Sequence, residues 1–132
     1  MPETLQKLLY VEDDESIAEI VLMTLQDLGG FEVKHCSSGQ QALDTIVAYA
    51  PQLVLMDVMM PGMDGPETLN RIRQLPDMQN LPVIFMTAKA QTHEQQTYLG
   101  LGAIGVIVKP FDPMTLTDHV NELWAKAGAR DK

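Results

Sequence analysis

The sequence has little cysteine, few basic residues and no long hydrophobic run. Its single cysteine, Cys36, cannot form a disulfide bond within the chain, so the cytoplasm is the expected compartment. Residues 1–6 lack the basic start and apolar stretch of a signal peptide, and no run approaches the roughly 20 apolar residues of a membrane-spanning helix. The net charge of −9 disfavours direct binding to nucleic acid or to an anionic membrane. It suits a site that attracts a divalent cation.

The length and composition predict one globular domain over residues 1–132. A hydrophobic content of 45% excludes disorder as the main state. The sequence contains no glycine-rich phosphate loop and no Cys/His metal spacing. The three histidines, His35, His93 and His119, are scattered and are interpreted as surface or packing residues.

Strand and helix patterns alternate along the whole chain. The predicted strands are residues 7–11, 31–36, 53–56, 81–86 and 102–108. The predicted helices are residues 15–28, the segment after Ser38 to residue 49 or 50, and residues 66–75, 93–101 and 113–127. Asp14 and Ser38 are the expected N-caps of the first two helices. Five βα units with short loops predict an α/β fold with a doubly wound parallel sheet, in the flavodoxin-like strand order 2-1-3-4-5.

The first predicted helix carries a broad apolar stripe. Its members are Ile17, Ile20, Val21, Met23, Leu25 and Leu28.

Asp57 is the most informative residue. It ends the apolar run Leu53–Met56 and opens the loop of residues 58–65. A lone carboxylate at the end of a buried strand is costly unless a charged group binds it. Other polar side chains also follow predicted strands: Glu12, Asp13, Thr87 and Lys109. The carboxyl ends of parallel strands meet at one sheet edge, so we expect these side chains to gather near the switch point between the first and third strands.

Glu12, Asp13 and Asp57 would crowd carboxylates into a small volume, and such crowding demands a cation. Mg²⁺, a hard cation that takes carboxylate and phosphate oxygens, fits that demand. Taken alone, the acids at 12–15 would fit the acidic first turn of a helix better than a metal site. Lys109 alone would equally fit a surface lysine before a turn. Taken together, they favour a site in which Lys109 pairs with Asp57, and a cis Lys109–Pro110 bond would aim the lysine inward.

Four segments in this order and spacing resemble the motifs of a response-regulator receiver domain of bacterial two-component signalling, of the chemotaxis-regulator-like kind. They are Val11–Asp14, Met56–Gly65, Met86–Ala88 and Val108–Phe111. The resemblance covers the chain from Leu8 to about Ala127.

The resemblance implies a Mg²⁺ site and a phosphoacceptor. Asp57 would accept the phosphoryl group. Asp13 would bind Mg²⁺ directly, Glu12 would bind it through water, and the backbone carbonyl of Met59 would be a further ligand. Thr87 and Lys109 would contact the phosphoryl group.

The implied partners are a sensor histidine kinase or phosphotransfer protein and an unidentified downstream protein. The chain would catalyse only its own phosphorylation and dephosphorylation. Met59 and Lys89 occupy positions that tune hydrolysis of the phosphoryl group in the family. Slow self-dephosphorylation is expected, because Met59 should hinder the attacking water and Lys89 offers no acid or amide to orient it.

The expected switch surface comprises the fourth helix, the fifth strand and the fifth helix. Many family members carry an aromatic residue three positions before the lysine, and Val106 stands there instead. The predicted surface has few positive groups to pair with its acids, so the phosphorylated chain should be a monomer or weak dimer.

Two other classes of function stay open at this point. A Mg²⁺-dependent aspartyl-phosphate hydrolase would need a cap or substrate pocket, for which the chain has no spare residues. A scaffold that has lost its chemistry is disfavoured because the acids, threonine and lysine are all present. A stand-alone receiver and a fragment of a longer protein are equally compatible with the sequence.

Overall fold

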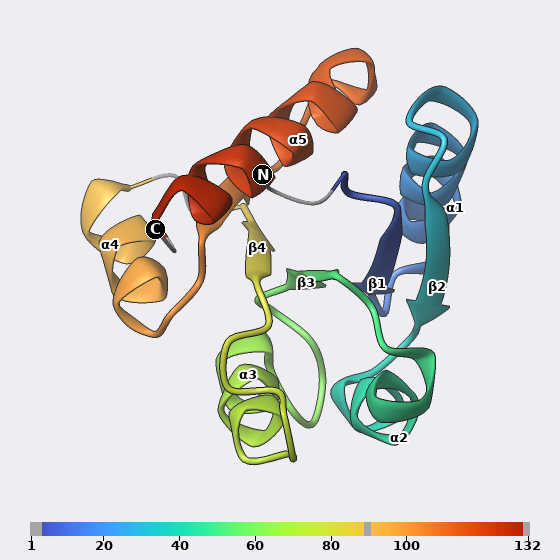
Figure 1. The fold of residues 1–132 in the computed structure, drawn as a ribbon. Helices are drawn as coiled ribbons and strands as arrows, with labels where there is room; N and C mark the ends of the chain where they lie inside the picture. The colour runs from blue at the N-terminus through green and yellow to red at the C-terminus, as the bar shows by residue number, and fades with distance from the viewer. Residues whose placement is uncertain (1–3, 89–90, 131–132) are drawn as a thin grey trace.

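The computed structural model describes residues 4–88 and 91–130, which form a parallel sheet between two layers of helices (Figure 1). The strands are β1 Lys7–Val11, β2 Glu32–Cys36, β3 Leu53–Asp57, β4 Val83–Thr87 and β5 Gly105–Val108. The helices are α1 Glu15–Met23, α2 Gly39–Tyr49, α3 Gly65–Arg73, α4 Thr92–Gly100 and α5 Pro113–Arg130. A short π-helix, η1 Thr24–Leu28, continues α1. The strand order is β2-β1-β3-β4-β5 with every pair parallel, which confirms the predicted doubly wound α/β fold.

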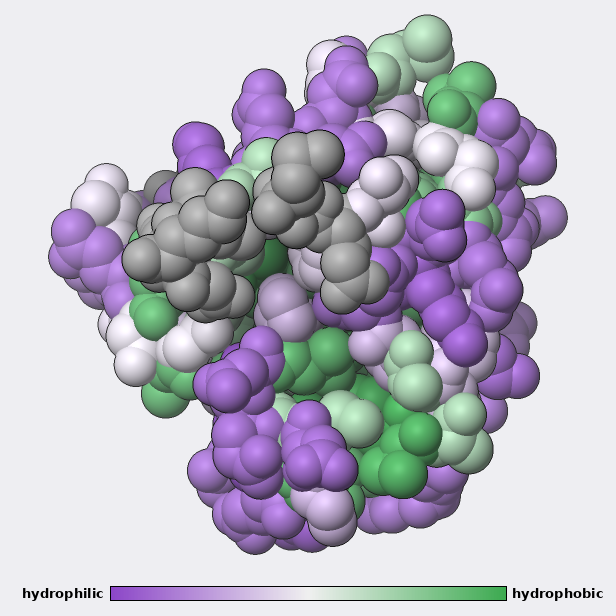
Figure 2. Space-filling model, viewed as in Figure 1, coloured by the Kyte–Doolittle hydropathy of each residue, from purple (hydrophilic) through white to green (hydrophobic). Residues whose placement is uncertain are grey.

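The helices cover both faces of the sheet, α1 and α5 on one side and α2 and α3 on the other (Figure 1). Alternate residues of β1 enter the two cores: Leu8 and Tyr10 pack toward α1 and α5, whereas Leu9 and Val11 pack toward α2 and α3. Burial of each large apolar side chain contributes roughly 1.5–3 kcal/mol. Hydrophilic residues cover most of the helical surface in Figure 2, and hydrophobic ones show mainly between α2 and α3. None of the described helices is long and apolar enough to cross a membrane.

Both predicted N-caps are confirmed. The Asp14 side chain accepts hydrogen bonds from the backbone N–H groups of Ser16 (2.9 Å) and Ile17 (3.2 Å). Ser38 Oγ accepts from the N–H of Gln41 at 3.1 Å. Such caps each stabilise a helix by roughly 1 kcal/mol. They also fix where the loops after β1 and β2 end, and so help to hold the carboxyl edge of the sheet.

Only part of the apolar stripe of the first helix is buried. Val21 and Leu25 are fully buried, but Ile20, Met23 and Leu28 are 52%, 56% and 60% exposed. The buried residues lie four apart, in one row that faces the sheet, and the others project to the side of that row. The last turn also widens into the π-helix, so Leu28 does not continue the buried row.

The fifth strand is three residues shorter than predicted, beginning at Gly105 instead of Gly102. Gly102 has a φ of +108°, a conformation open to glycine, and its N–H bonds the Leu99 carbonyl at 3.0 Å to close the turn after α4. The apolar pair at 103–104 therefore belongs to a turn. The last helix, α5, continues to Arg130, beyond the predicted end at Ala127.

Candidate metal centre at the carboxyl edge of the sheet

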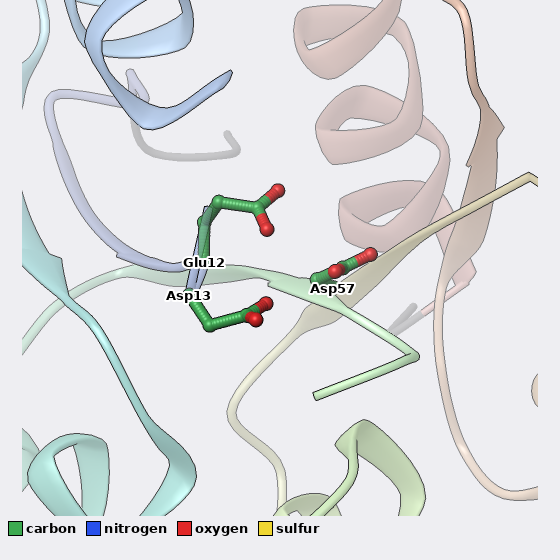
Figure 3. Close-up of side chains that lie close together, drawn as sticks. All are labelled: Glu12, Asp13 and Asp57. Atoms are coloured by element: carbon green, nitrogen blue, oxygen red, sulfur yellow. The ribbon is translucent and has the colours of Figure 1, made fainter. Parts of the chain in front are cut away.

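Glu12, Asp13 and Asp57 converge at the carboxyl edge, as predicted. β1 and β3 are neighbours with Val11 opposite Met56, so the residues that follow β1 lie beside the end of β3. One oxygen of each carboxylate lies within 4.8 Å of the others, and Figure 3 shows that the three side chains lie close together. Glu12 and Asp57 are buried, whereas Asp13 is exposed. The cluster is therefore open to solvent at Asp13.

Lys109 reaches the same cluster from the end of β5. Its Nζ donates to Asp57 Oδ1 at 2.9 Å and to Glu12 Oε1 at 3.0 Å. The Lys109–Pro110 bond is cis, in agreement with the sequence-based expectation. The pairing with Asp57 was predicted, but the pairing with Glu12 was not. One ammonium group therefore bridges two of the three acids.

Burial and contact with neighbouring charges shift the pKa values of Glu12 and Lys109. Burial raises the pKa of Glu12, the Lys109 hydrogen bond lowers it, and the nearby charge of Asp57 raises it again, so the pKa ends above its usual value. Burial alone would lower the pKa of Lys109, but the hydrogen bonds and charges of Asp57 and Glu12 outweigh it and raise the pKa. Lys109 is therefore charged at neutral pH and holds the acids together.

Thr87 ends β4, the strand between β3 and β5. It is 1% exposed, and its backbone carbonyl accepts from the Lys109 N–H at 2.7 Å. Met86 lies opposite Asp57 in the register of the two strands. Thr87 therefore follows directly after Met86, the residue opposite Asp57 in the sheet, and its backbone is hydrogen-bonded to that of Lys109.

Two predicted contributors are placed less fully. The Met59 side chain is 65% exposed, and a ligand role for its backbone carbonyl stays a prediction. Lys89 lies outside the residues that the structure describes.

Two residues that sequence reasoning overlooked surround Glu12. The Tyr10 hydroxyl donates to Glu12 Oε1 at 3.4 Å, and His35 Nε2 lies 2.9 Å from the Glu12 backbone carbonyl. The period-2 pattern of a strand places Tyr10 and Glu12 on the same face, so the tyrosine was open to prediction. The histidine comes from the neighbouring strand and required the register.

The donor set fits a hard cation. All three side-chain donors are carboxylate oxygens, the ligands that Mg²⁺ prefers. Glu12, Asp13 and Asp57 would hold the ion, and exposed Asp13 leaves room for water and phosphate oxygens. With the ammonium group of Lys109 beside them, the site combines a nucleophilic carboxylate with charges that can stabilise a phosphoryl group.

An apolar hollow of about 340 Å³ adjoins Lys109. Its walls include Ile17 and Ile20 of α1, together with Phe111 and Pro113 at the start of α5. The exposed side chain of Ile20 is thus part of a concave apolar surface beside Lys109.

Known proteins share both the sequence pattern and the fold. The family model of the response regulator receiver domain matches residues 8–121. Response regulator Rre1 of Synechocystis is 35% identical over 92% of this chain and 53% of its own length. The phosphate regulon transcriptional regulatory protein PhoB of Rhizobium meliloti is 33% identical over 93% of this chain and 54% of its own length. The chain thus spans about half the length of these curated relatives.

Solved structures agree with these relatives. Chemotaxis protein CheY4 of Vibrio cholerae superposes with a TM-score of 0.83 at 32% identity, over 91% of this chain and 99% of that one. The receiver domain of Francisella response regulator 1452 gives a TM-score of 0.80 at 29% identity, over 92% of this chain and 98% of that one. The motifs, the strand order and these matches agree, and the chain belongs to the response regulator receiver domain family.

Proposed function

We propose that this chain is a phosphoacceptor signalling module. Asp57 takes a phosphoryl group from the phosphohistidine of a sensor histidine kinase or phosphotransfer protein in a Mg²⁺-dependent reaction. The modification then switches a protein-interaction surface. The observation that carries the proposal is the convergence of three acids with Lys109 at one edge of a receiver fold.

The residues of the site have separate roles in this mechanism. A carboxylate oxygen of Asp57 attacks phosphorus, the P–N bond to the donor imidazole breaks, and its electron pair stays on that nitrogen. Lys109, already 2.9 Å from Asp57 Oδ1, neutralises charge on the transferred oxygens. The buried hydroxyl of Thr87 contacts the phosphoryl group. Glu12, Asp13 and Asp57 would hold a Mg²⁺ ion, which would add to the neutralisation of the phosphoryl oxygens.

The apolar hollow beside Lys109 supports a protein as the phosphodonor. A small phosphodonor has no apolar surface to bury there, whereas a donor protein can place an aliphatic or aromatic side chain against Ile20 and Phe111. Ile20→Asp should therefore slow transfer from a phosphohistidine protein and leave labelling by a small phosphodonor unchanged. Equal slowing with both donors would argue against docking at this surface.

The output surface is proposed to lie on α4, β5 and α5. Within the described residues of α4, Tyr98 is the buried side chain, and its ring packs edge-on against Phe85 of β4 at 5.5 Å between centroids. A helix held by so few buried contacts can shift at low cost. Val106 replaces the usual aromatic residue of β5. We therefore propose that Thr87 is coupled to the output surface through β4, whose Phe85 contacts Tyr98 of α4.

The modified chain should remain a monomer or weak dimer and act on a downstream protein, without contacting nucleic acid itself. Light scattering with and without beryllofluoride measures the oligomeric state directly. A tight, salt-sensitive dimer that forms only on activation would contradict it. A cytoplasmic location and a single domain over residues 1–132 stay predictions.

The central test is phosphorylation of Asp57. We expect intact mass to rise by one phosphoryl group after incubation with acetyl phosphate and Mg²⁺, and not in EDTA. Asp57→Asn should abolish labelling, whereas Asp44→Asn, which removes an exposed carboxylate on α2, should not. Full labelling of the Asp57→Asn variant would falsify the assignment. Repeated turnover of a phosphoester would instead favour the hydrolase alternative.

A further inference from the structure

Every polar atom of Glu12 in the backbone and side chain has a partner. Its N–H donates to the Cys36 carbonyl at 3.0 Å, and its carbonyl lies 2.9 Å from His35 Nε2. Oε1 accepts from Lys109 at 3.0 Å and from the Tyr10 hydroxyl at 3.4 Å. Oε2 accepts from the Asp14 N–H at 3.2 Å. With 1% of its surface exposed, Glu12 is more tightly fixed than its neighbour Asp13.

The Glu12 carbonyl is bonded by a side chain from the neighbouring strand. β2 ends at Cys36, and the next backbone N–H, that of Ser37, donates to the Gln41 side chain at 2.6 Å. His35 donates instead through Nε2–H, in the tautomer that carries its proton there. The backbone of Glu12 is thereby held in line beyond the last paired residue of β1.

The two rings also support each other. Tyr10 and His35 lie opposite each other in the β1–β2 register, and their ring centroids are 5.6 Å apart. Tyr10 is fully buried, so its hydroxyl cannot exchange Glu12 for bulk water. The ring of His35 limits the movement of the tyrosine, and the tyrosine directs one oxygen of Glu12.

We propose that Tyr10 and His35 are positioning residues that orient Glu12 for cation binding. This inference rests on the proposed function, in which the acid cluster binds a divalent ion. A glutamate has one more rotatable bond than an aspartate, and repulsion from Asp13 and Asp57 would turn it away from them. Tyr10 fixes the carboxylate and His35 fixes the backbone, so less order has to be gained when the ion binds.

The simplest competing role for Tyr10 is that of a core side chain. Tyr10→Phe separates the two roles, because it keeps the ring and removes only the hydroxyl. Tyr49→Phe is the matched control: Tyr49 ends α2 and packs near Lys7, at the opposite end of β1 from Glu12. His35→Phe keeps a ring against Tyr10 and removes the donor to the backbone.

Titration calorimetry with MgCl₂ measures the effect directly. Loss of a hydrogen bond of ordinary strength corresponds to a roughly 3- to 10-fold weaker interaction. We therefore expect a dissociation constant for Mg²⁺ about 3- to 10-fold higher in Tyr10→Phe and in His35→Phe, and an unchanged value in Tyr49→Phe. With acetyl phosphate as donor, the Mg²⁺ concentration for half-maximal labelling should rise while the rate at saturating Mg²⁺ stays within about twofold of wild type.

Several results would overturn the inference. The inference is wrong if Tyr10→Phe and His35→Phe bind Mg²⁺ as tightly as the wild type. It is also wrong if Tyr49→Phe loses as much Mg²⁺ affinity as they do. A fall in the saturated rate with unchanged Mg²⁺ affinity would assign Tyr10 to a different role. Circular dichroism in EDTA identifies any variant that does not fold, and the other variant then decides the question. Failure of the wild-type chain to bind Mg²⁺ at all would instead remove the proposed function on which the inference rests.

Discussion

Replacing Lys109 with methionine tests the charge balance of the site most directly. The lysine makes ion pairs at 2.9 and 3.0 Å with two buried acids, and its own side chain is only 17% exposed. Removing one partner of a buried ion pair costs roughly 3–5 kcal/mol because the other charge is left uncompensated. Since Lys109 keeps some contact with solvent, we expect Lys109→Met to lower the free energy of unfolding in EDTA by about 3 kcal/mol.

The loss in free energy of unfolding caused by Lys109→Met should depend on pH. The pKa of Glu12 is already raised by burial and by the charge of Asp57, against the lowering effect of Lys109. A carboxyl group whose pKa is higher in the folded state favours folding below its unfolded pKa, about 4.3 for glutamate. That contribution is lost as the pH rises through the folded pKa. Without Lys109 the folded pKa rises further, so the deficit of the variant should shrink as the pH is lowered from neutrality.

Mg²⁺ should reverse the loss, since a bound cation replaces the missing positive charge. We expect saturating Mg²⁺ to stabilise Lys109→Met more than wild type. Urea unfolding followed by far-UV circular dichroism, in EDTA and in Mg²⁺, measures both quantities. Lys126→Met, which removes an exposed charge from α5, is the control and should change stability little. If Lys109→Met matches wild type in EDTA, or gains no more than wild type from Mg²⁺, the bridging role assigned to the lysine is wrong.

Three further predictions concern other parts of the site and fold. A Cβ on Gly65 would lie 2.6 Å from the Asp57 backbone oxygen, so Gly65→Ala should cost about 1–3 kcal/mol in urea unfolding and slow Asp57 labelling. Gly100→Ala, where a Cβ meets nothing within 4 Å, should not destabilise; equal effects of the two variants would refute the packing argument. Burial raises the pKa of the Cys36 thiol, so iodoacetamide should modify it much more slowly in the native chain than in urea. The free energy of unfolding should also fall as the pH rises above the ordinary thiol pKa of about 8.5, because the unfolded chain then loses the thiol proton more readily than the folded chain. Met59, 65% exposed and two residues past the phosphoacceptor, should hinder attack by water, so Met59→Asn should shorten the measured half-life of the phosphoryl group; a longer or unchanged half-life would contradict this.

The fold could be predicted from sequence because most strands and helices carried a local pattern that agreed with its neighbours, although the helix at 93–101 is less clearly patterned. The apolar run at 53–56 is buried on both faces, as a central parallel strand requires. The sequence does not show which part of the apolar stripe of the first helix is buried, because packing decides between equivalent patterns. Ile20 and Val21 are equally apolar, yet only the row that contains Val21 faces the sheet.

The candidate site was predictable in its members and less so in its contacts. Strand ends and a parallel sheet suffice to bring Asp57 near the acids and Lys109. The Lys109–Glu12 pair joins residues 97 positions apart, and no local pattern shows which of several acids a lysine will bridge. The His35 contact depends on where β2 stops relative to β1, which only the register of the two strands gives.

The strand order also sets when the site can become complete during synthesis. In the finished sheet, β3, β4 and β5 follow β1 on the side away from β2, in the order in which they are synthesised. The three acids are all present once residue 57 has been made, but Lys109 follows with the last strand. At about 5–20 residues per second, translation leaves an interval of roughly 3–10 s between them. Throughout that interval, the nascent chain has its three carboxylates but not yet the ammonium group that bridges two of them in the folded protein.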